Sequence, residues 1–190
     1  MRASGAATLV AAIAACGRNP PPPDAAVGPT PARTVPLASV HLLLQSEAPP
    51  PDTAVTLSAG TPRHILFRTA HEDRDVVADL YFGEQAFQAP AGTPVPVTVR
   101  PAPGSYGLVL TAGAPFARGG EITFKYAVHF LQPPESVQKY PNHVLFEHAL
   151  VVGRLAADGQ IDLLPSIRPA TDNLRAPADS PGTYVVAAPR

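Results

Sequence analysis

Alternation of apolar and polar residues with a period of two is the feature that most constrains the fold of this chain. It is clearest in residues 121–131, which read EITFKYAVHFL. One face of an extended strand there would carry Ile122, Phe124, Tyr126, Val128 and Phe130, and the other Glu121, Thr123, Lys125 and His129. Because successive side chains of a β-strand point to opposite faces, this pattern predicts a strand with one buried and one exposed face.

Similar short runs recur along the chain between turn sequences rich in Gly and Pro. The turn sequences include SAGTP at 58–62, PAGTP at 90–94 and AADG at 156–159. The predicted strands are 40–44, 53–58, 63–69, 76–82, 95–100, 105–111, 121–131 and 183–188. About eight or nine short strands punctuated in this way predict an all-β domain, a single antiparallel β-sandwich.

Two stretches of the chain begin alike: PGSYGLVL at 103–110 and PGTYVVAA at 181–188. In each, a Pro-Gly turn leads into a strand that starts with tyrosine. We expect Tyr106 and Tyr184 to pack in the core, each hydroxyl reaching a polar partner at the rim, because a buried tyrosine hydroxyl needs a hydrogen bond.

Residues 142–159, NHVLFEHALVVGRLAADG, are compatible with two structures. A helix capped by Asn142 and ended near Gly159 would place Val144, Leu145, His148, Val151, Val152 and Leu155 on one face. A strand would place Val144, Phe146, His148, Leu150 and Val152 on one face. The pair of valines and Gly153 lower the helix propensity, so the strand is favoured, with His148 half-buried on its apolar face.

The N-terminal residues MRASGAATLVAAIAACGR have the organisation of a secretory signal peptide. Arg2 precedes a short run of small and apolar residues that is too short to span a bilayer. The residues Ile13, Ala14 and Ala15 before Cys16 resemble the lipobox of bacterial lipoproteins. The resemblance implies cleavage between Ala15 and Cys16 and lipidation of Cys16; the alternative is an ordinary signal peptide with a chance cysteine.

A proline-rich segment follows the cysteine. Residues 19–36 read NPPPPDAAVGPTPARTVP, which favours extended polyproline II at about 3.1 Å per residue. The predicted organisation is therefore a signal peptide at 1–15, a lipidated cysteine and linker at 16–36, and a β-sandwich domain at 37–190. No Asp follows Cys16, so the resemblance implies a lipid-anchored protein of the cell envelope, at the outer membrane of a two-membrane bacterium.

The stretch from Val55 to Leu110 resembles a cupredoxin-like domain in outline, because a Gly turn and a strand lead into Pro-Gly-x-Tyr. Immunoglobulin-like sandwiches use the same order of turns and strands. A blue-copper site needs a cysteine thiolate and usually a methionine besides two histidines. The chain has one Cys and one Met, and both lie at the N-terminus. The resemblance therefore implies the scaffold without its copper ligands.

His143, Glu147 and His148, in the sequence HVLFEH, are the candidate metal ligands. On a strand, His143 and His148 would face opposite ways, and His143 and Glu147 would lie about 13 Å apart. On a helix, His143 and Glu147 would be neighbours, and a metal site would become plausible. Since the strand is favoured, no metal or other cofactor is predicted.

The remaining sequence excludes some functions and leaves others open. With 14 basic and 15 acidic residues and no basic run, the chain offers nothing for nucleic-acid binding. It contains no Gly-x-Ser-x-Gly or His-Glu-x-x-His motif of hydrolases.

We therefore expect a non-catalytic binding or scaffolding module anchored to the membrane. Its partner would be another envelope protein, bound through an edge strand, or a glycan. The alternative is a periplasmic protein that handles Cu or Zn through His and carboxylate ligands.

Overall fold

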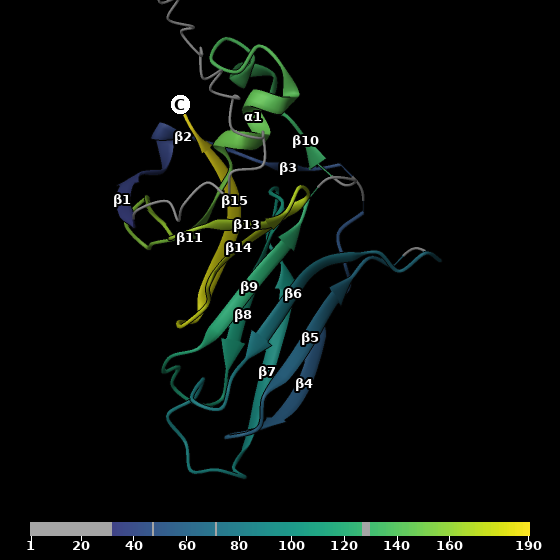
Figure 1. Cartoon of the computed structure of the whole chain (residues 1–190), viewed down its shortest axis with the longest axis vertical. Helices are drawn as coiled ribbons and strands as arrows, with labels where there is room; N and C mark the ends of the chain where they lie inside the picture. The colour runs from purple at the N-terminus through teal and green to yellow at the C-terminus, as the bar shows by residue number, and fades with distance from the viewer. Residues whose placement is uncertain (1–31, 47, 71, 127–129) are drawn as a thin grey trace, which may run out of the picture.

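The computed structural model describes residues 32–46, 48–70, 72–126 and 130–190, and it is an all-β sandwich, as predicted (Figure 1). Two antiparallel sheets pack face to face, and a two-stranded sheet and a short helix lie at one end. None of the helices in the described residues is long and apolar enough to cross a membrane.

The larger sheet has eight strands. Seven of them form the order β1-β12-β11-β15-β8-β7-β4, and β2 also pairs with β15. Their bounds are β1 Arg33–Pro36, β2 Val40–Leu42, β4 Thr53–Ser58, β7 Pro94–Pro101, β8 Gly107–Ala112, β11 Val151–Leu155, β12 Gln160–Leu163 and β15 Gly182–Pro189.

The second sheet has five strands in the order β13-β14-β9-β6-β5. Their bounds are β5 Arg63–Arg68, β6 Val76–Phe82, β9 Gly120–Lys125, β13 Ile167–Ala170 and β14 Asn173–Pro177. The two-stranded sheet pairs β3, Leu44–Gln45, with β10, Phe130–Leu131.

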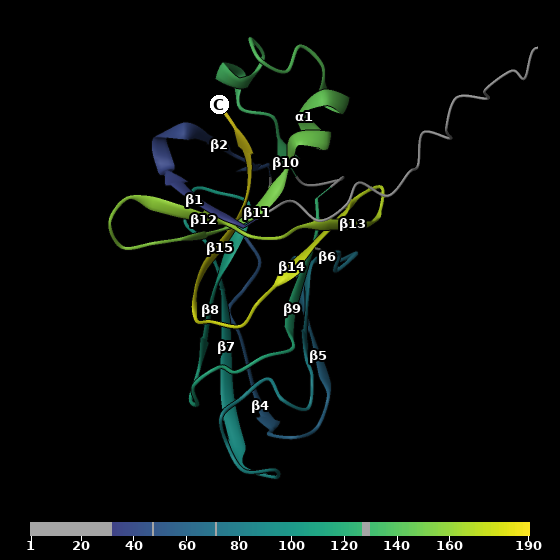
Figure 2. The same ribbon diagram turned by 60° about the vertical axis from the view of Figure 1, so that its left-hand side comes forward.

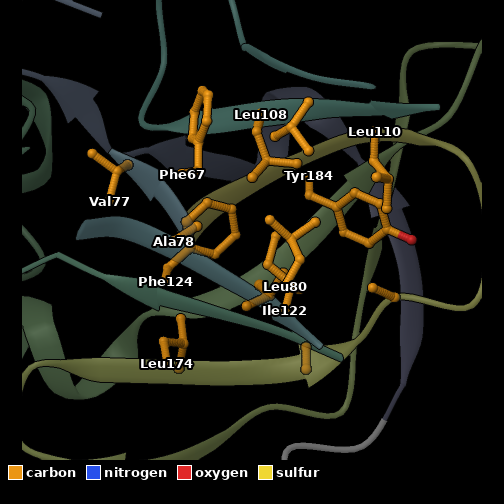
Figure 3. Packing of buried hydrophobic residues seen from close by; sticks show 14 of the residues in the cluster. Phe67, Val77, Ala78, Leu80, Leu108, Leu110, Ile122, Phe124, Leu174 and Tyr184 are labelled. Carbon is orange, nitrogen blue, oxygen red and sulfur yellow. The ribbon is translucent and has the colours of Figure 1, made fainter. Parts of the chain in front are cut away.

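The main core lies between the two large sheets. Leu80, Leu108, Ile122, Phe124 and Tyr184 point toward one another there, and all five are almost fully buried (Figure 3). The predicted alternation is confirmed in β9, where Ile122 and Phe124 are buried and Lys125 is exposed. Val128 and His129 of the same predicted strand lie outside the described residues.

The two similar stretches around Tyr106 and Tyr184 are neighbours in the larger sheet. Strands β8 and β15 pair antiparallel, with Leu108 opposite Tyr184 and Gly107 opposite Val185. Both tyrosine rings are buried, as predicted. The Tyr106 hydroxyl donates to the carbonyl of Lys125, and the Tyr184 hydroxyl donates to the carbonyl of Ser180 at 2.7 Å.

A smaller apolar cluster lies on the other face of the larger sheet. Its buried members are Val40, Ala102, Val151, Ile161, Leu163, Val185 and Ala187. Strand β15 contributes to both clusters, and its residues from Tyr184 to Ala188 are all buried. Burial on both faces explains why this strand reads as a continuous apolar run.

The strand preferred for residues 142–159 is wrong for the first half of that segment and right for part of the second. Residues His143–Ala149 form α1, and the Asn142 side chain accepts a hydrogen bond from the Leu145 N–H at 2.9 Å. Leu150 is extended and β11 begins at Val151. The cap therefore determines the helix start, and the β-branched pair Val151–Val152 favours the strand.

Four strands lie outside the predicted set: β1, β12, β13 and β14. Strand β1 lies in the range predicted as linker, and it pairs with β12 from Arg33 opposite Leu163 to Pro36 opposite Gln160. Strand pairing thus begins before the predicted start of the domain at residue 37.

Candidate functional site

The two large sheets end in four strands, namely β1 and β4 in one and β13 and β5 in the other. An edge strand presents unpaired backbone groups that another chain can pair with. Strands β1 and β13 are four residues long and contain Pro36 and Pro169, which lack a backbone N–H donor. Strands β4 and β5 are six residues long and contain no proline. The accessible edges are therefore β4 and β5.

Strand β5, with the sequence RHILFR, differs from β4 in the side chains that it presents. Ile65 and Phe67 are buried in the core, so the alternate residue Leu66 points outward, with 42% of its surface exposed. The exposed residues of β4 are small, namely Ala54, Thr56 and Ser58. In both views of the ribbon, β5 lies at the margin of the sandwich (Figures 1 and 2).

A row of side chains crosses the outer face of the five-stranded sheet from this edge. The cross-strand register places Leu66 opposite Asp79, Asp79 opposite Thr123, Thr123 opposite Arg175, and Arg175 opposite Ile167. We call these five residues the outer row. Both ends of the row are exposed apolar side chains, since Ile167 is 38% exposed.

His64 is held in place beside the outer row. Its Nδ1 atom lies 2.8 Å from Asp79 Oδ1, and its ring centroid lies 4.9 Å from that of Tyr81. The imidazole remains 59% exposed. A histidine oriented by a carboxylate is one element of a hydrolytic site, but that chemistry also needs a nucleophile within hydrogen-bond reach. Among the described residues, the structure shows no hydrogen bond from His64 to a hydroxyl group.

A shallow groove of about 300 Å³ lies at the other end of the outer row, between β13, β14 and the start of β9. Glu121 Oε2 lies 3.7 Å from an Arg175 guanidinium nitrogen on its wall. Asp179 Oδ1 accepts a hydrogen bond from the Gly120 N–H at 3.0 Å. The first contact pairs two charges of the groove, and the second is a hydrogen bond between the Asp179 carboxylate and a backbone amide.

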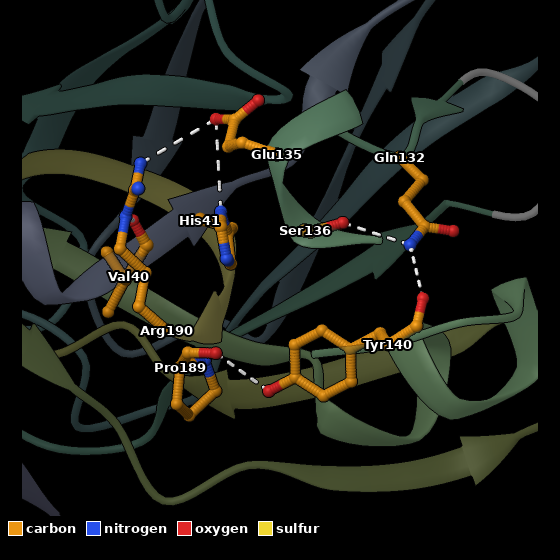
Figure 4. A network of polar contacts seen from close by, with 8 residues as sticks. All are labelled: Val40, His41, Gln132, Glu135, Ser136, Tyr140, Pro189 and Arg190. Atoms are coloured by element: carbon orange, nitrogen blue, oxygen red, sulfur yellow. Dashed lines mark hydrogen bonds and ion pairs between the residues drawn. The ribbon is translucent and has the colours of Figure 1, made fainter. Parts of the chain in front are cut away.

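A polar network lies near the helical end of the sandwich and attaches the last strand to the segment before α1 (Figure 4). His41 is 4% exposed, and its Nδ1 atom lies 3.8 Å from Glu135 Oε1. Arg190 lies 3.6 Å from the same carboxylate oxygen. The Tyr140 hydroxyl donates to the Pro189 carbonyl at 2.7 Å. Burial, and then the charge of Arg190, lower the pKa of His41.

The predicted metal ligands are only partly brought together. Because residues 143–149 are helical, His143 Nε2 lies 3.4 Å from Glu147 Oε1. His148 is exposed rather than half-buried, since Phe146 is the residue that α1 buries, against Tyr140. Within the described residues, no three His, Cys, Asp or Glu side chains gather as a metal site would require. Ala15 and Cys16 lie outside the described residues.

Arg168 is a structural residue that the sequence pattern did not single out. Its guanidinium donates to the carbonyls of Glu147 and Leu150, the latter at 2.9 Å, and to the Tyr126 hydroxyl. These bonds satisfy the end of α1, where a positive charge also complements the helix dipole. Arginine from a distant strand leaves no local signal for this role.

Comparisons with protein families, with curated proteins and with solved structures find no match for this chain.

Proposed function

We propose that this chain is a lipid-anchored protein of the cell envelope whose β-sandwich is a binding module without covalent chemistry. The lipobox-like residues before Cys16 and the proline-rich segment after it support the anchored part of this proposal. Two or more acyl chains hold a protein firmly to a bilayer, whereas one gives marginal binding. The sandwich would then be presented to partners at the membrane surface.

The accessible edge strand β5 is the observation that supports a binding function. Among the residues that the structure describes, its backbone is paired on one side only, and it presents the exposed Leu66. Strand addition to a sheet edge is a common mode of recognition, in which backbone hydrogen bonds supply affinity and side chains supply specificity.

The anchor is tested by comparing the full-length chain with its Cys16→Ser variant in a bacterial host. We expect the parent to be cleaved before Cys16, to gain the mass of its acyl chains and to fractionate with membranes, and the variant to lose the lipid mass and the membrane association. Identical masses after processing and identical fractionation of the two proteins would overturn the anchored part of the proposal.

Metal handling is the second candidate, and the pairing of His143 with Glu147 on α1 favours it. Imidazole and carboxylate are both ligands for Zn²⁺ and Cu²⁺. We would titrate the Cys16→Ser protein with Zn²⁺ and compare His143→Ala with the control His64→Ala, which alters a second, separate histidine–carboxylate pair. Stoichiometric binding lost only in His143→Ala would favour this role, and binding unaffected by either change would exclude the α1 site.

A further inference from the structure

We infer that β5 binds an extended peptide segment in which an apolar residue is flanked, two positions away on each side, by carboxylates. This inference rests on the proposed binding function and specifies its surface and its partner. It does not depend on the lipid anchor, so the two can fail separately.

The backbone of β5 is the first requirement for such a partner. Over its whole length of six residues, from Arg63 to Arg68, the strand pairs with β6 and with no other strand of the described part of the chain. The register with β6 shifts only between Phe67 and Arg68. The extra residue at this shift is Val77 of β6, so an incoming strand can pair with β5 up to Arg68, where no proline interferes.

The side chains that face outward from β5 define the chemistry of the partner. His64, Leu66 and Arg68 alternate with the buried Ile65 and Phe67 and so share the outer face. Directly opposed residues of neighbouring strands have Cβ atoms about 5 Å apart and interact. An apolar residue opposite Leu66 would extend its contact, and carboxylates opposite His64 and Arg68 would meet groups that carry or can accept positive charge.

The two basic side chains are already held by contacts within the chain. Arg68 donates to the carbonyl of Arg74 at 2.8 Å, and His64 is held by Asp79. Ordered donors lose less conformational freedom on binding than mobile ones. Glu72 and Asp73 follow in the adjacent exposed turn, so an acidic segment that extended past Arg68 would be repelled. The partner's carboxylates are thereby confined to the length of β5.

A second copy of the chain is a poor occupant of this edge. Antiparallel pairing of two β5 strands that keeps both outer faces on the same side of the joined sheet is centred on Leu66, and it would place His64 of each copy opposite Arg68 of the other. This register sets two basic side chains directly against each other at both ends, which does not stabilise the pairing as opposite charges would. The same basic side chains favour an acidic partner. We therefore choose the acidic peptide because its charge complements that of β5.

The test uses the full chain with Cys16→Ser and a fluorescent, end-blocked peptide of sequence Thr-Glu-Thr-Leu-Thr-Glu-Thr, with binding followed by anisotropy at low salt. A second peptide replaces both Glu by Lys, and a third carries N-methyl groups on the amides of the pairing edge. We expect the Glu peptide to bind about tenfold more tightly than the Lys peptide, since two cross-strand charge pairs differ. The N-methylated peptide should not bind, because it cannot complete the backbone pairing.

Variants of the protein locate the site. We expect Leu66→Asp to weaken binding of the Glu peptide about tenfold and Arg68→Glu to reverse the preference toward the Lys peptide. Leu66→Thr, which adds no charge, serves as the second variant should Leu66→Asp fail to fold. The control is Thr56→Asp, an exposed position on the other accessible edge, β4, and it should leave the affinity unchanged.

Several results would overturn the inference. These are no binding of the Glu peptide, equal binding of the Glu and Lys peptides, full binding of the N-methylated peptide, and an equal loss in Thr56→Asp. Self-association abolished by Leu66→Asp would assign the edge to a second copy instead. Binding to anionic phospholipid vesicles that depends on Arg68, without binding of the peptide, would assign the surface to a membrane.

Discussion

Strands β15 and β5 have similar β-forming sequences but opposite positions in the sandwich. β15 contains TYVVAA and lies between β8 and β11, with residues 184–188 buried on both faces. β5 contains HILF and lies at a sheet edge, where Leu66 is 42% exposed. Apolar content alone therefore does not tell a central strand from an edge strand; the number of neighbouring strands does.

The comparison also separates two kinds of polar side chain. Tyr184 and His41 lie in or beside β15 and are buried, whereas Tyr81 and His64 lie on the outer face beside β5. The buried groups fasten segments of the fold together. His64 is oriented by its contacts with Asp79 and Tyr81 and remains accessible, which is the combination that a binding surface requires.

The sharpest test of the comparison is to place the same charge in both strands. Val186→Asp would bury an unpaired carboxylate in the main core, and we expect it to lower the free energy of unfolding by about 4 kcal/mol or more. Leu66→Asp should change it by less than about 1 kcal/mol, because the carboxylate stays in water. Urea unfolding followed by circular dichroism measures both values, and similar losses would show that β5 is covered in solution.

Adding a side chain where β8 packs against β15 should have the next largest effect on the free energy of unfolding. A Cβ added at Gly107 would lie 2.3 Å from the carbonyl oxygen of Tyr184, a backbone atom that cannot move without breaking the pairing. We expect Gly107→Ala to cost about 2–3 kcal/mol in urea unfolding. Gly92→Ala is the control, because its Cβ would meet no atom within 4 Å and only its φ of +84° costs energy, about 1 kcal/mol. Equal losses would contradict close packing at Gly107.

Alkaline pH should weaken the sandwich through the tyrosine of β15. Burial raises the pKa of Tyr184 from 10.0 to about 12, so the unfolded chain releases this proton first. Its contribution is fully present below pH 10 and is lost as the pH rises from 10 to about 12, at up to about 1.4 kcal/mol per pH unit. Unfolding free energies across this range should fall less steeply in Tyr184→Phe than in the parent. A slope in Tyr184→Phe equal to that of the parent would contradict the prediction.

Acidic pH should have the smallest effect, through His41 beside β15. Because burial lowers the pKa of His41 in the folded chain, the unfolded chain binds the proton more readily. The contribution of this group is therefore lost as the pH falls below the ordinary histidine value of 6.5. Unfolding measured from pH 7.5 to 5 should depend less on pH in His41→Phe than in the parent. An unchanged slope in His41→Phe would show that His41 is solvated.

Much of the fold could be predicted because its signals are local. Strand β6 has the predicted bounds, and the inward set of β7, with Val95, Val97 and Val99, follows from alternation. Segment 142–159 was harder, since Asn142 and Val151–Val152 favour different structures within a few residues. Strand β1 was missed because its proline-rich sequence forms a strand only by pairing with β12.

Less of the candidate site could be predicted from the sequence. The strand at 63–69 was predicted, but its local sequence could not show that it lies at an edge. The contact of His64 with Asp79 depends on the register of β5 with β6. Whether His143 and Glu147 are close depends on whether residues 143–147 form a helix. A strand would separate them by about 13 Å, whereas the helix makes them an ion pair.

By itself, the sequence determined that the chain forms antiparallel strands, where most of them turn, and which side chains point inward. These properties depend on residues close together along the chain. Only the tertiary structure decided the order of the strands, the burial of β15 on both faces and the exposure of β5 at an edge. The physical reason is that a strand's neighbours come from distant parts of the chain, and a local pattern of period two is the same whether one side of the strand or both sides are paired.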